Sequence, residues 1–184
     1  LLQYFQEKKI PILGIEPAEN VAKKAIEKNI PTMTKFFNSK IANQLSQDKK
    51  LADLIVGNNV LAHVPDLNDF IKGIKIILKP KGIITLEFPH LLQLIKFNQF
   101  DTIYHEHFSY FSLISLEKIF LFHKLRIFDV EEISTHGGSL RIYVTHLENE
   151  SNNIAKNVNE VLNKEKEFGL DNISKYLEFS KNVK

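Results

Sequence analysis

The 184-residue chain has no cysteine and no tryptophan, and little methionine, glycine or proline. The absence of cysteine excludes disulfides and thiolate metal sites and favours a reducing compartment, so we expect a cytoplasmic protein. A charge excess of one sign is also absent, since 24 basic and 22 acidic residues give a net charge of +2. Composition therefore gives no case for a nucleic-acid partner. No apolar run approaches the ~18 residues of a membrane span, so no membrane partner is expected.

What the chain does contain is the composition of an ordinary globular protein. It is 43% hydrophobic, 10% aromatic and 25% charged, which excludes a wholly disordered chain. Its length suffices for one substantial domain with a real core. Composition predicts neither a substrate nor an oligomeric state.

Short apolar runs alternate with helical patterns through the first two thirds of the chain. The runs predict buried strands over residues 10–16, 34–38, 52–60 and 83–88. Helical spacing predicts helices over residues 2–9, 18–29, 39–49, 67–78 and 113–124. Strands that alternate with helices through short connections predict an α/β fold, a Rossmann-like sheet with helices on both faces.

The last third of the chain changes character. Residues 125–133 and 139–146 predict an antiparallel edge pair near residues 125–146, whereas Lys-Pro-Lys-Gly at residues 79–82 predicts a turn. A weak apolar stripe predicts helices after Glu148. We therefore divide the chain into a core at residues 1–149 and a helical segment at residues 150–184.

Acidic and amide side chains follow two of the predicted strands. An acid such as Glu16, at the end of a strand, commonly accepts both hydroxyls of a ribose, although a solvated acid or an N-cap is an equal alternative. Asn58 and Asn59 follow Gly57 where open α/β sheets hold ligands, although a simple loop would look the same. A Gly-rich loop should precede such a first strand, but no glycine occurs before Gly14. We expect a nucleoside-binding sheet whose first strand and loop are missing from this chain.

The densest chemically active segment is Tyr104-His105-Glu106-His107. Imidazole, carboxylate and phenol this close together suit proton abstraction next to a carbonyl. Histidine is the natural base because its pKa lies near the working pH. Two alternatives stay open: a metal site that adds His63 or Glu106 to the two histidines, although no specific metal spacing is present, and aromatic packing with incidental histidines.

Four sequence blocks occur together in one known family. They are Ile15-Glu-Pro17, Gly57 to Asp66, Phe100 to His107, and His136-Gly-Gly-Ser-Leu-Arg141. On these blocks the chain resembles the S-adenosylmethionine-dependent C-methyltransferases that act on nucleotide-linked ketodeoxysugars. The Tyr-x-Glu-His and His-Gly-Gly-Ser blocks are rather specific to that family, whereas the Glu-Pro and Asn-Asn blocks are common to many Rossmann-like methyltransferases.

The resemblance implies a role for each of these side chains, by position. S-adenosylmethionine would be held by Glu16, Pro17, Phe37, Asn38, Asn58 and Asn59. The catalytic group would be His107 as the base, with Glu106, Tyr104 and His63. The nucleotide-sugar substrate would contact His90 and His136, and no metal would take part. His90 departs from the tyrosine that relatives usually carry there.

The resemblance also implies a three-part protein, with a zinc-binding module before this domain and a Rossmann-like module after it. We therefore expect the chain to be an internal piece that binds cofactor weakly or not at all by itself, with zinc only in the missing N-terminal module. Two other classes stay open: a non-catalytic nucleotide- or protein-binding domain, and a nicotinamide-dependent nucleotide-sugar enzyme.

Overall fold

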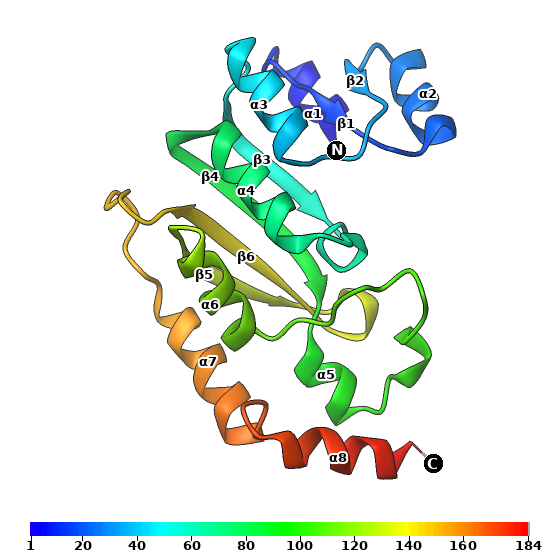
Figure 1. Ribbon diagram of the computed structural model, residues 1–184, viewed down its shortest axis with the longest axis vertical. Coiled ribbons are helices and arrows are strands. Elements are labelled where there is room, and N and C mark those ends of the chain that lie inside the picture. Colours follow the sequence, from blue (N-terminus) through cyan, green and yellow to red (C-terminus); the bar gives the residue numbers. More distant parts are fainter. Residues whose placement is uncertain (184) are drawn as a thin grey trace.

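A mixed four-stranded sheet dominates the computed structural model, which describes residues 1–183 (Figure 1). The strands are β1 (Gly14–Ile15), β2 (Thr32–Met33), β3 (Ala52–Asn58), β4 (Leu78–Pro89), β5 (Leu125–Ile133) and β6 (Ser139–His146). The α-helices are α1 (Leu2–Glu7), α2 (Glu19–Glu27), α3 (Ser39–Gln47), α4 (Leu67–Ile77), α5 (Leu91–Lys96), α6 (Leu113–Phe122), α7 (Lys156–Phe168) and α8 (Ile173–Asn182). Short 3₁₀ turns are η1 (Leu61–His63), η2 (Phe100–Thr102) and η3 (Thr135–Gly137).

The strand order in the large sheet is β3–β4–β6–β5. β3 and β4 are parallel, with Asn58 opposite Glu87, and β6 runs antiparallel to both of its neighbours. β1 and β2 form a separate parallel pair. The carboxyl ends of β3 and β4 therefore meet at one edge of the sheet, the place where open α/β sheets hold ligands.

The main core lies between the large sheet and the helices α4, α6 and α7. Alternate residues of β4, namely Ile84, Leu86 and Phe88, are fully buried against these helices. Each buried side chain of this size contributes roughly 1.5–3 kcal/mol. On the opposite face the register partners Val56, Thr85 and Tyr143 stay partly exposed. One face of the large sheet thus supplies most of the packing that holds the fold together.

Local sequence sets where the core helices begin. The Asp66 side chain accepts a hydrogen bond from the backbone N–H of Asp69 at 3.0 Å, which caps α4. At α6, Ser112 and Ser115 form a reciprocal capping box. Both devices satisfy N–H groups that a helix leaves without partners in its first turn.

The first part of the chain is held by fewer contacts. β1 and β2 are two residues each, and Ala22 is the one fully buried residue among those that form α2. Ile15 and Met33 pack against the small cluster around α3. On the other face of β1, Leu2 of α1 lies 3.4 Å from where a Cβ on Gly14 would be. Helices therefore flank this strand pair on both sides.

The predicted fold class is confirmed, because the structure is α/β with a mixed sheet flanked by helices. The antiparallel pair has the predicted bounds, 125–133 and 139–146, with β5 at the edge. Residues after 150 form α7 and α8 as expected, and Val158, Val161 and Leu162 of α7 join the main core. The division of the chain at residue 149 stays a prediction.

Two local predictions are wrong. The strand expected over residues 34–38 lies instead at Thr32–Met33, where β1 offers a partner. The turn expected at residues 79–82 is part of β4, whose Leu78 pairs with Ala52 across an irregularity in the ladder.

Among residues 1–183, no helix combines the length and the apolar character that crossing a membrane requires.

Candidate active site

The predicted catalytic residues lie in the segment between β4 and α6. This segment leaves the sheet after Pro89, forms α5 and η2, and returns at Phe111, which makes an isolated parallel bridge with His90. Its Phe108 donates a backbone hydrogen bond to the carbonyl of Ala62 in η1 at 2.9 Å. Because η1 directly follows β3, this contact brings the two sequence regions together at the carboxyl edge of the sheet.

The His107 ring is held at both nitrogens. Its Nδ1 lies 2.9 Å from the backbone carbonyl of Thr102. A carbonyl only accepts, so the hydrogen of the neutral ring must be on Nδ1, and Nε2 keeps a free electron pair. The Tyr104 hydroxyl lies 3.1 Å from Nε2 and donates to it. The arrangement leaves Nε2 as the basic nitrogen, which is the form of imidazole that removes a proton.

His63 lies beside His107 and is held in the same way. Its Nδ1 is 3.0 Å from the carbonyl of Glu106, and its ring centroid is 4.8 Å from that of His107. The same reasoning puts the hydrogen of the neutral His63 ring on Nδ1 and leaves Nε2 without a hydrogen. Two imidazoles and the Tyr104 phenol therefore converge on one region, although they come from segments about 40 residues apart in the chain.

The Glu106 carboxylate does not contact the two histidines, although it is predicted to belong to the catalytic group. Glu106 is exposed, and among residues 1–183 its carboxylate makes no hydrogen bond or ion pair. Its contribution to the group is the backbone carbonyl that holds His63. The carbonyl of Thr102 orients His107 instead, and side-chain types in the sequence give no signal for such a main-chain contact.

The predicted cofactor residue Asn59 carries a specific sign of an absent partner. Its backbone N–H donates to the carbonyl of Glu87 at 2.8 Å, and its φ is 54°. Within residues 1–183, Oδ1 of Asn59 is buried and accepts no hydrogen bond. A buried acceptor without a donor is costly. The ammonium of an amino-acid-like cofactor is a donor that fits this atom, and the exposed Asn58 lies next to it.

Glu16 follows β1 directly, as predicted, and Pro17 is exposed after it. Oε1 of Glu16 accepts the backbone N–H of Ala18 at 2.9 Å, at the start of α2. One carboxylate oxygen thus accepts a hydrogen bond at the start of α2. The other oxygen makes no hydrogen bond among the described residues. Both sequence interpretations, ribose binding and helix capping, are compatible with this geometry.

Phe37 and Asn38, predicted to lie by the adenine, have structural partners. Phe37 packs edge-on against Phe70 with ring centroids 5.6 Å apart. The Oδ1 of Asn38 is used to cap α3. Both residues are half-buried, so their role in cofactor binding stays a prediction.

The two predicted substrate residues lie in different surroundings. His90 is 2% exposed, and its Nε2 donates to Oε1 of Glu165 at 2.8 Å. A direct contact between the His90 ring and a substrate does not fit this burial, which corrects the prediction. His136 is exposed on η3 with a φ of 51°. The adjacent Gly137 carbonyl accepts from Gln99 at 2.9 Å, which ties this turn to the catalytic segment.

A buried acid borders the same edge of the sheet. Glu87, on β4, is 5% exposed and accepts hydrogen bonds from Arg141 at 3.0 Å and Thr135 at 3.3 Å. The hydrogen bond with Glu87 raises the pKa of the Arg141 guanidinium above its ordinary value. The paired charges fix the start of β6 against the end of β4, next to the turn that carries His136.

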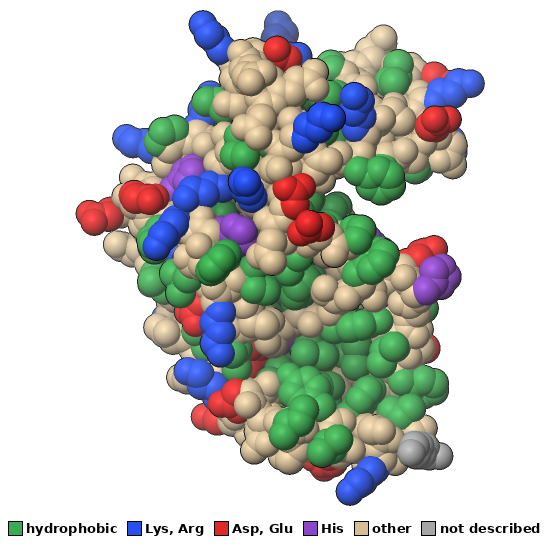
Figure 2. Space-filling view, viewed as in Figure 1, with side chains coloured by type: hydrophobic (Ala, Val, Ile, Leu, Met, Phe, Trp, Pro, Cys, Tyr) green, Lys and Arg blue, Asp and Glu red, His purple; other side chains and the backbone are tan. Residues whose placement is uncertain are grey.

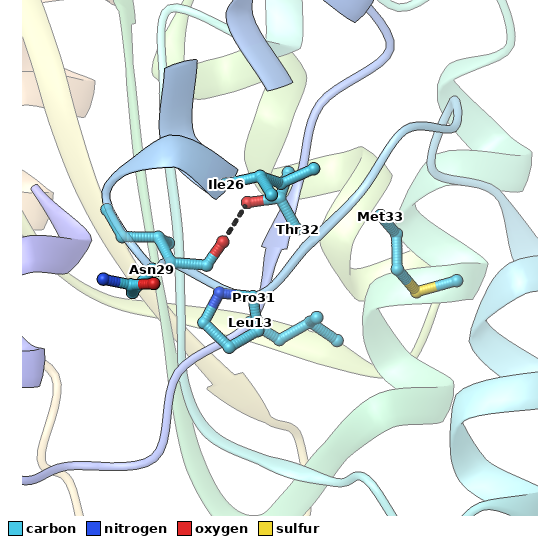
Figure 3. A pocket seen from close by; sticks show the side chains of 7 residues that line it. Leu13, Ile26, Asn29, Pro31, Thr32 and Met33 are labelled. Carbon is cyan, nitrogen blue, oxygen red and sulfur yellow. Dashed lines mark hydrogen bonds between the residues drawn. The ribbon is translucent and has the colours of Figure 1, made fainter. Parts of the chain in front are cut away.

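Two further observations bear on what the site can bind. Within residues 1–183, no three acidic or histidine side chains lie together as a metal site would need. A hollow of about 570 Å³ opens between the starts of β1 and β2 and the end of α2 (Figure 3). Leu13, Pro31 and Met33 line it, and Thr32 there bonds the carbonyl of Ile30 at 3.0 Å. None of the predicted site residues lines this hollow.

Taken together, the structure is an α/β fold in which an acid and two amides follow parallel strands, and a separate segment brings two histidines together. Residues 1–124 match the methyltransferase-domain family, and residues 134–184 match the C-methyltransferase C-terminal domain. The chain belongs to the methyltransferase-domain family.

Individual relatives agree with this assignment. The chain is 35% identical to the C-methyltransferase NovU of Streptomyces niveus over 179 residues, which are 97% of this chain and 42% of NovU. It therefore spans less than half the length of that relative. The predicted resemblance to C-methyltransferases is confirmed.

Solved structures share the fold at low sequence identity. A SAM-dependent methyltransferase of Anabaena variabilis matches with a TM-score of 0.61 and 15% identity, over 79% of this chain and 72% of that one. The magnesium protoporphyrin IX methyltransferase of Synechocystis, solved with bound SAH, matches with a TM-score of 0.56 and 16% identity, over 74% of this chain and 64% of that one.

Proposed function

We propose that this chain is the catalytic part of a cytoplasmic, S-adenosylmethionine-dependent C-methyltransferase that acts on a nucleotide-linked ketodeoxysugar. One observation supports this proposal most: the Thr102 carbonyl leaves Nε2 of His107 basic, and the side chains of Tyr104 and His63 both lie beside the His107 ring. The cytoplasmic location rests on the absence of cysteine. The cofactor has support in the SAH-bound methyltransferase of the same fold.

The chemistry requires a carbon acid to be ionised. A C–H next to a ketone is a much weaker acid than imidazolium, so the enolate must be stabilised as it forms. Nε2 of His107 takes the proton, and the electron pair of the C–H bond moves into the enolate. General-base help of this kind contributes about 10²–10⁴ in rate.

Tyr104 and His63 supply hydrogen bonds around the base. Without substrate, the Tyr104 hydroxyl donates to the one electron pair on Nε2 of His107. It must turn away before Nε2 can take the substrate proton, and its O–H is then available to donate to the enolate oxygen. His63 lies beside the same ring, and with a hydrogen on both of its nitrogens it can also donate to that oxygen.

The residues proposed to bind the cofactor take no part in the proton transfer. Glu16 would accept the ribose hydroxyls, and Oδ1 of Asn59 would accept the cofactor ammonium. When bound, S-adenosylmethionine supplies a methyl group already activated by its sulfonium, which a carbanion accepts.

A non-catalytic binding domain would not need the histidines to meet. Their convergence therefore favours an enzyme over a packing role for the His-Glu-His segment. A nicotinamide-dependent enzyme would share the acid at the strand end, but it would consume a different cofactor.

The test uses the natural protein that carries this chain. It is incubated with S-adenosylmethionine and nucleotide-linked ketodeoxysugars in D₂O, and the products are followed by NMR. We expect a new methyl signal on carbon next to the ketone, and deuterium at that carbon in unreacted substrate. The matched control is the sugar with its ketone reduced to an alcohol, which should be inert. Methylation on oxygen or nitrogen, or turnover that depends on a nicotinamide, would contradict the proposal.

A further inference from the structure

A fully buried carboxylate lies among the apolar side chains of α7. Glu165 has no exposed surface and follows Val158, Val161 and Leu162 on the buried face of the helix. Packing alone would favour an apolar residue there, because a buried carboxylate is costly unless its oxygens are hydrogen-bonded. The role of this carboxylate is therefore to accept hydrogen bonds and not to add hydrophobic packing.

Both oxygens of Glu165 are occupied by N–H donors. Oε1 accepts from Nε2 of His90 at 2.8 Å and from the backbone N–H of Leu113 at 2.6 Å. Oε2 accepts from the backbone N–H of Ile114 at 2.8 Å. The last two donors belong to the first turn of α6, where a helix has free N–H groups and favours negative charge.

These three donors mark the two ends of the catalytic segment. His90 is the last residue before α5, and Leu113 opens α6, so the residues between them carry Tyr104 and His107. The backbone joins the same two ends, since the N–H of Leu91 donates to the carbonyl of Phe111 at 3.0 Å. One side chain, Glu165, holds both ends from a third element.

The segment between these two ends carries exposed hydrophobic side chains. Hydrophobic side chains gather on the face over α5, the segment after it and α8 (Figure 2). Phe97, Phe100 and Phe108 are 60%, 55% and 59% exposed, so these large side chains of the segment pack little against the core. The helix α5 at the start of the segment is better packed, because its Leu92, Leu94 and Ile95 are buried in a small cluster with Leu170. The lightly packed part is therefore the stretch after α5, which carries Tyr104 and His107.

We infer that Glu165 is a positioning residue, which fixes the segment bearing His107 by clamping both of its ends to α7. This inference rests on the proposed function, because it assigns Glu165 a part in presenting the proposed base. Displacing a catalytic group by about 1 Å can cost on the order of 10²-fold in rate. A clamp at the ends sets the place of the base without touching cofactor or substrate.

Two variants and a control test the clamp in the natural protein. Glu165→Ala removes all three acceptor contacts, whereas Glu165→Gln keeps one carbonyl oxygen. Glu167→Gln, an exposed acid on the same helix, is the matched control. Hydrogen exchange measures the backbone of residues 91–112 and, as a reference, of β5 and β6, while kinetics measure kcat and the KM for S-adenosylmethionine.

We expect Glu165→Ala to raise exchange in residues 91–112 about tenfold, with β5 and β6 unchanged, because only the segment is released. Its kcat should fall about 10²-fold with an unchanged KM. Glu165→Gln should recover part of both losses, and it carries the test alone if the alanine variant does not fold.

Two outcomes would overturn the clamp: exchange and kcat equal to those of Glu167→Gln, or exchange that rises as much in β5 and β6 as in the segment. Failure of the proposed function looks different. If the unmodified protein transfers no methyl group to carbon, exchange confined to residues 91–112 still supports the clamp, and unchanged exchange still overturns it.

Discussion

Residues 1–33 and the large sheet differ greatly in how well they are packed. In the first 33 residues, Ala22 and Ile30 are the buried hydrophobic side chains, whereas Tyr4, Ile10, Val21 and Ile26 are about half exposed. In the large sheet, alternate residues of β4 and β6 are fully buried against three helices. Figure 1 shows the same contrast, with the short pair β1–β2 at one end of the large sheet.

Two residues of the proposed site belong to these two regions. The cofactor acid Glu16 lies in the lightly packed part, whereas His107 lies in a segment anchored on the well-packed part. Ribose binding by Glu16 and proton abstraction by His107 should therefore respond to different perturbations. Variants that disturb one of these residues should leave the other largely intact.

The largest difference is expected when one large apolar side chain is removed from each region. Phe120, in α6, has no exposed surface, so Phe120→Ala should lower the free energy of unfolding by about 3–5 kcal/mol. Ile26, in α2, is 51% exposed, so Ile26→Ala should cost only about 0.5 kcal/mol. Urea unfolding of the purified chain measures both.

The same helix offers a matched control for the core variant. Phe122 is 77% exposed, so Phe122→Ala should change stability by about 0.5 kcal/mol or less. Equal losses for the two phenylalanine variants would mean that α6 does not bury the face assigned to it.

The next variant acts on the lightly packed region. Glu16→Ala should raise the dissociation constant for SAH about 10–100-fold, since hydrogen bonds to a charged group contribute about 1.5–3 kcal/mol. The maximal rate should change little, because Glu16 does not belong to the group formed by His107, His63 and Tyr104. Calorimetry on the natural protein checks the affinity, with Glu19→Ala as the exposed neighbour control. An unchanged affinity would leave Glu16 with only its role at the start of α2.

Within the anchored segment, Tyr104→Phe should slow turnover about tenfold without a change in stability. The substitution removes the hydroxyl that we propose to donate to the enolate oxygen, a hydrogen bond that contributes about 1–1.5 kcal/mol, and Tyr104 is 43% exposed. Steady-state kinetics provide the measurement. Tyr110→Phe is the control, because its hydroxyl makes only a long contact of 3.4 Å to the Thr102 carbonyl. Equal effects of the two variants would speak against a direct role for Tyr104.

A smaller effect concerns the link between α3 and α4, and it depends on pH. The hydrogen bond from Ser39 lowers the pKa of Asp69 below its ordinary value of 3.8. A lowered pKa means that the ionised form stabilises the fold above pH 3.8 and that this contribution disappears as the pH falls further. Asp69→Asn should therefore cost about 1 kcal/mol at pH 7 and nothing at pH values well below 3.

Urea unfolding of the unmodified chain and of Asp69→Asn at both pH values gives this difference. Asp48→Asn, at an exposed residue, should show no such difference. A gap between Asp69→Asn and the unmodified chain that persists in acid would rule out the ionised carboxylate as its source.

A sequence pattern that is local and long predicts structure best. The strands at 125–133 and 139–146 can be predicted with their bounds, because alternation and a Gly-Gly turn mark them in the sequence itself. The two-residue β2 could not be found in this way. Its position depends on β1, and so short a run has no period of its own.

The same distinction between local patterns and distant partners applies to the candidate site. His107, Tyr104 and His63 could be chosen by residue type and block, and the structure brings them together. The burial of His90 could not be foreseen, since its partner Glu165 lies 75 residues away. The Thr102 carbonyl that sets the His107 tautomer is a main-chain group, which side-chain motifs do not encode.

The proposed mechanism depends most on His107 as the base, and solvent exchange tests this role directly. The natural protein and its His107→Asn variant are given the ketosugar in D₂O, and NMR follows deuterium entry at the carbon next to the ketone. We expect His107→Asn to keep cofactor and substrate binding while exchange slows by about 10²–10⁴, and the exposed neighbour variant His105→Asn to exchange normally. Exchange in His107→Asn as fast as in the unmodified protein would show that another group removes the proton.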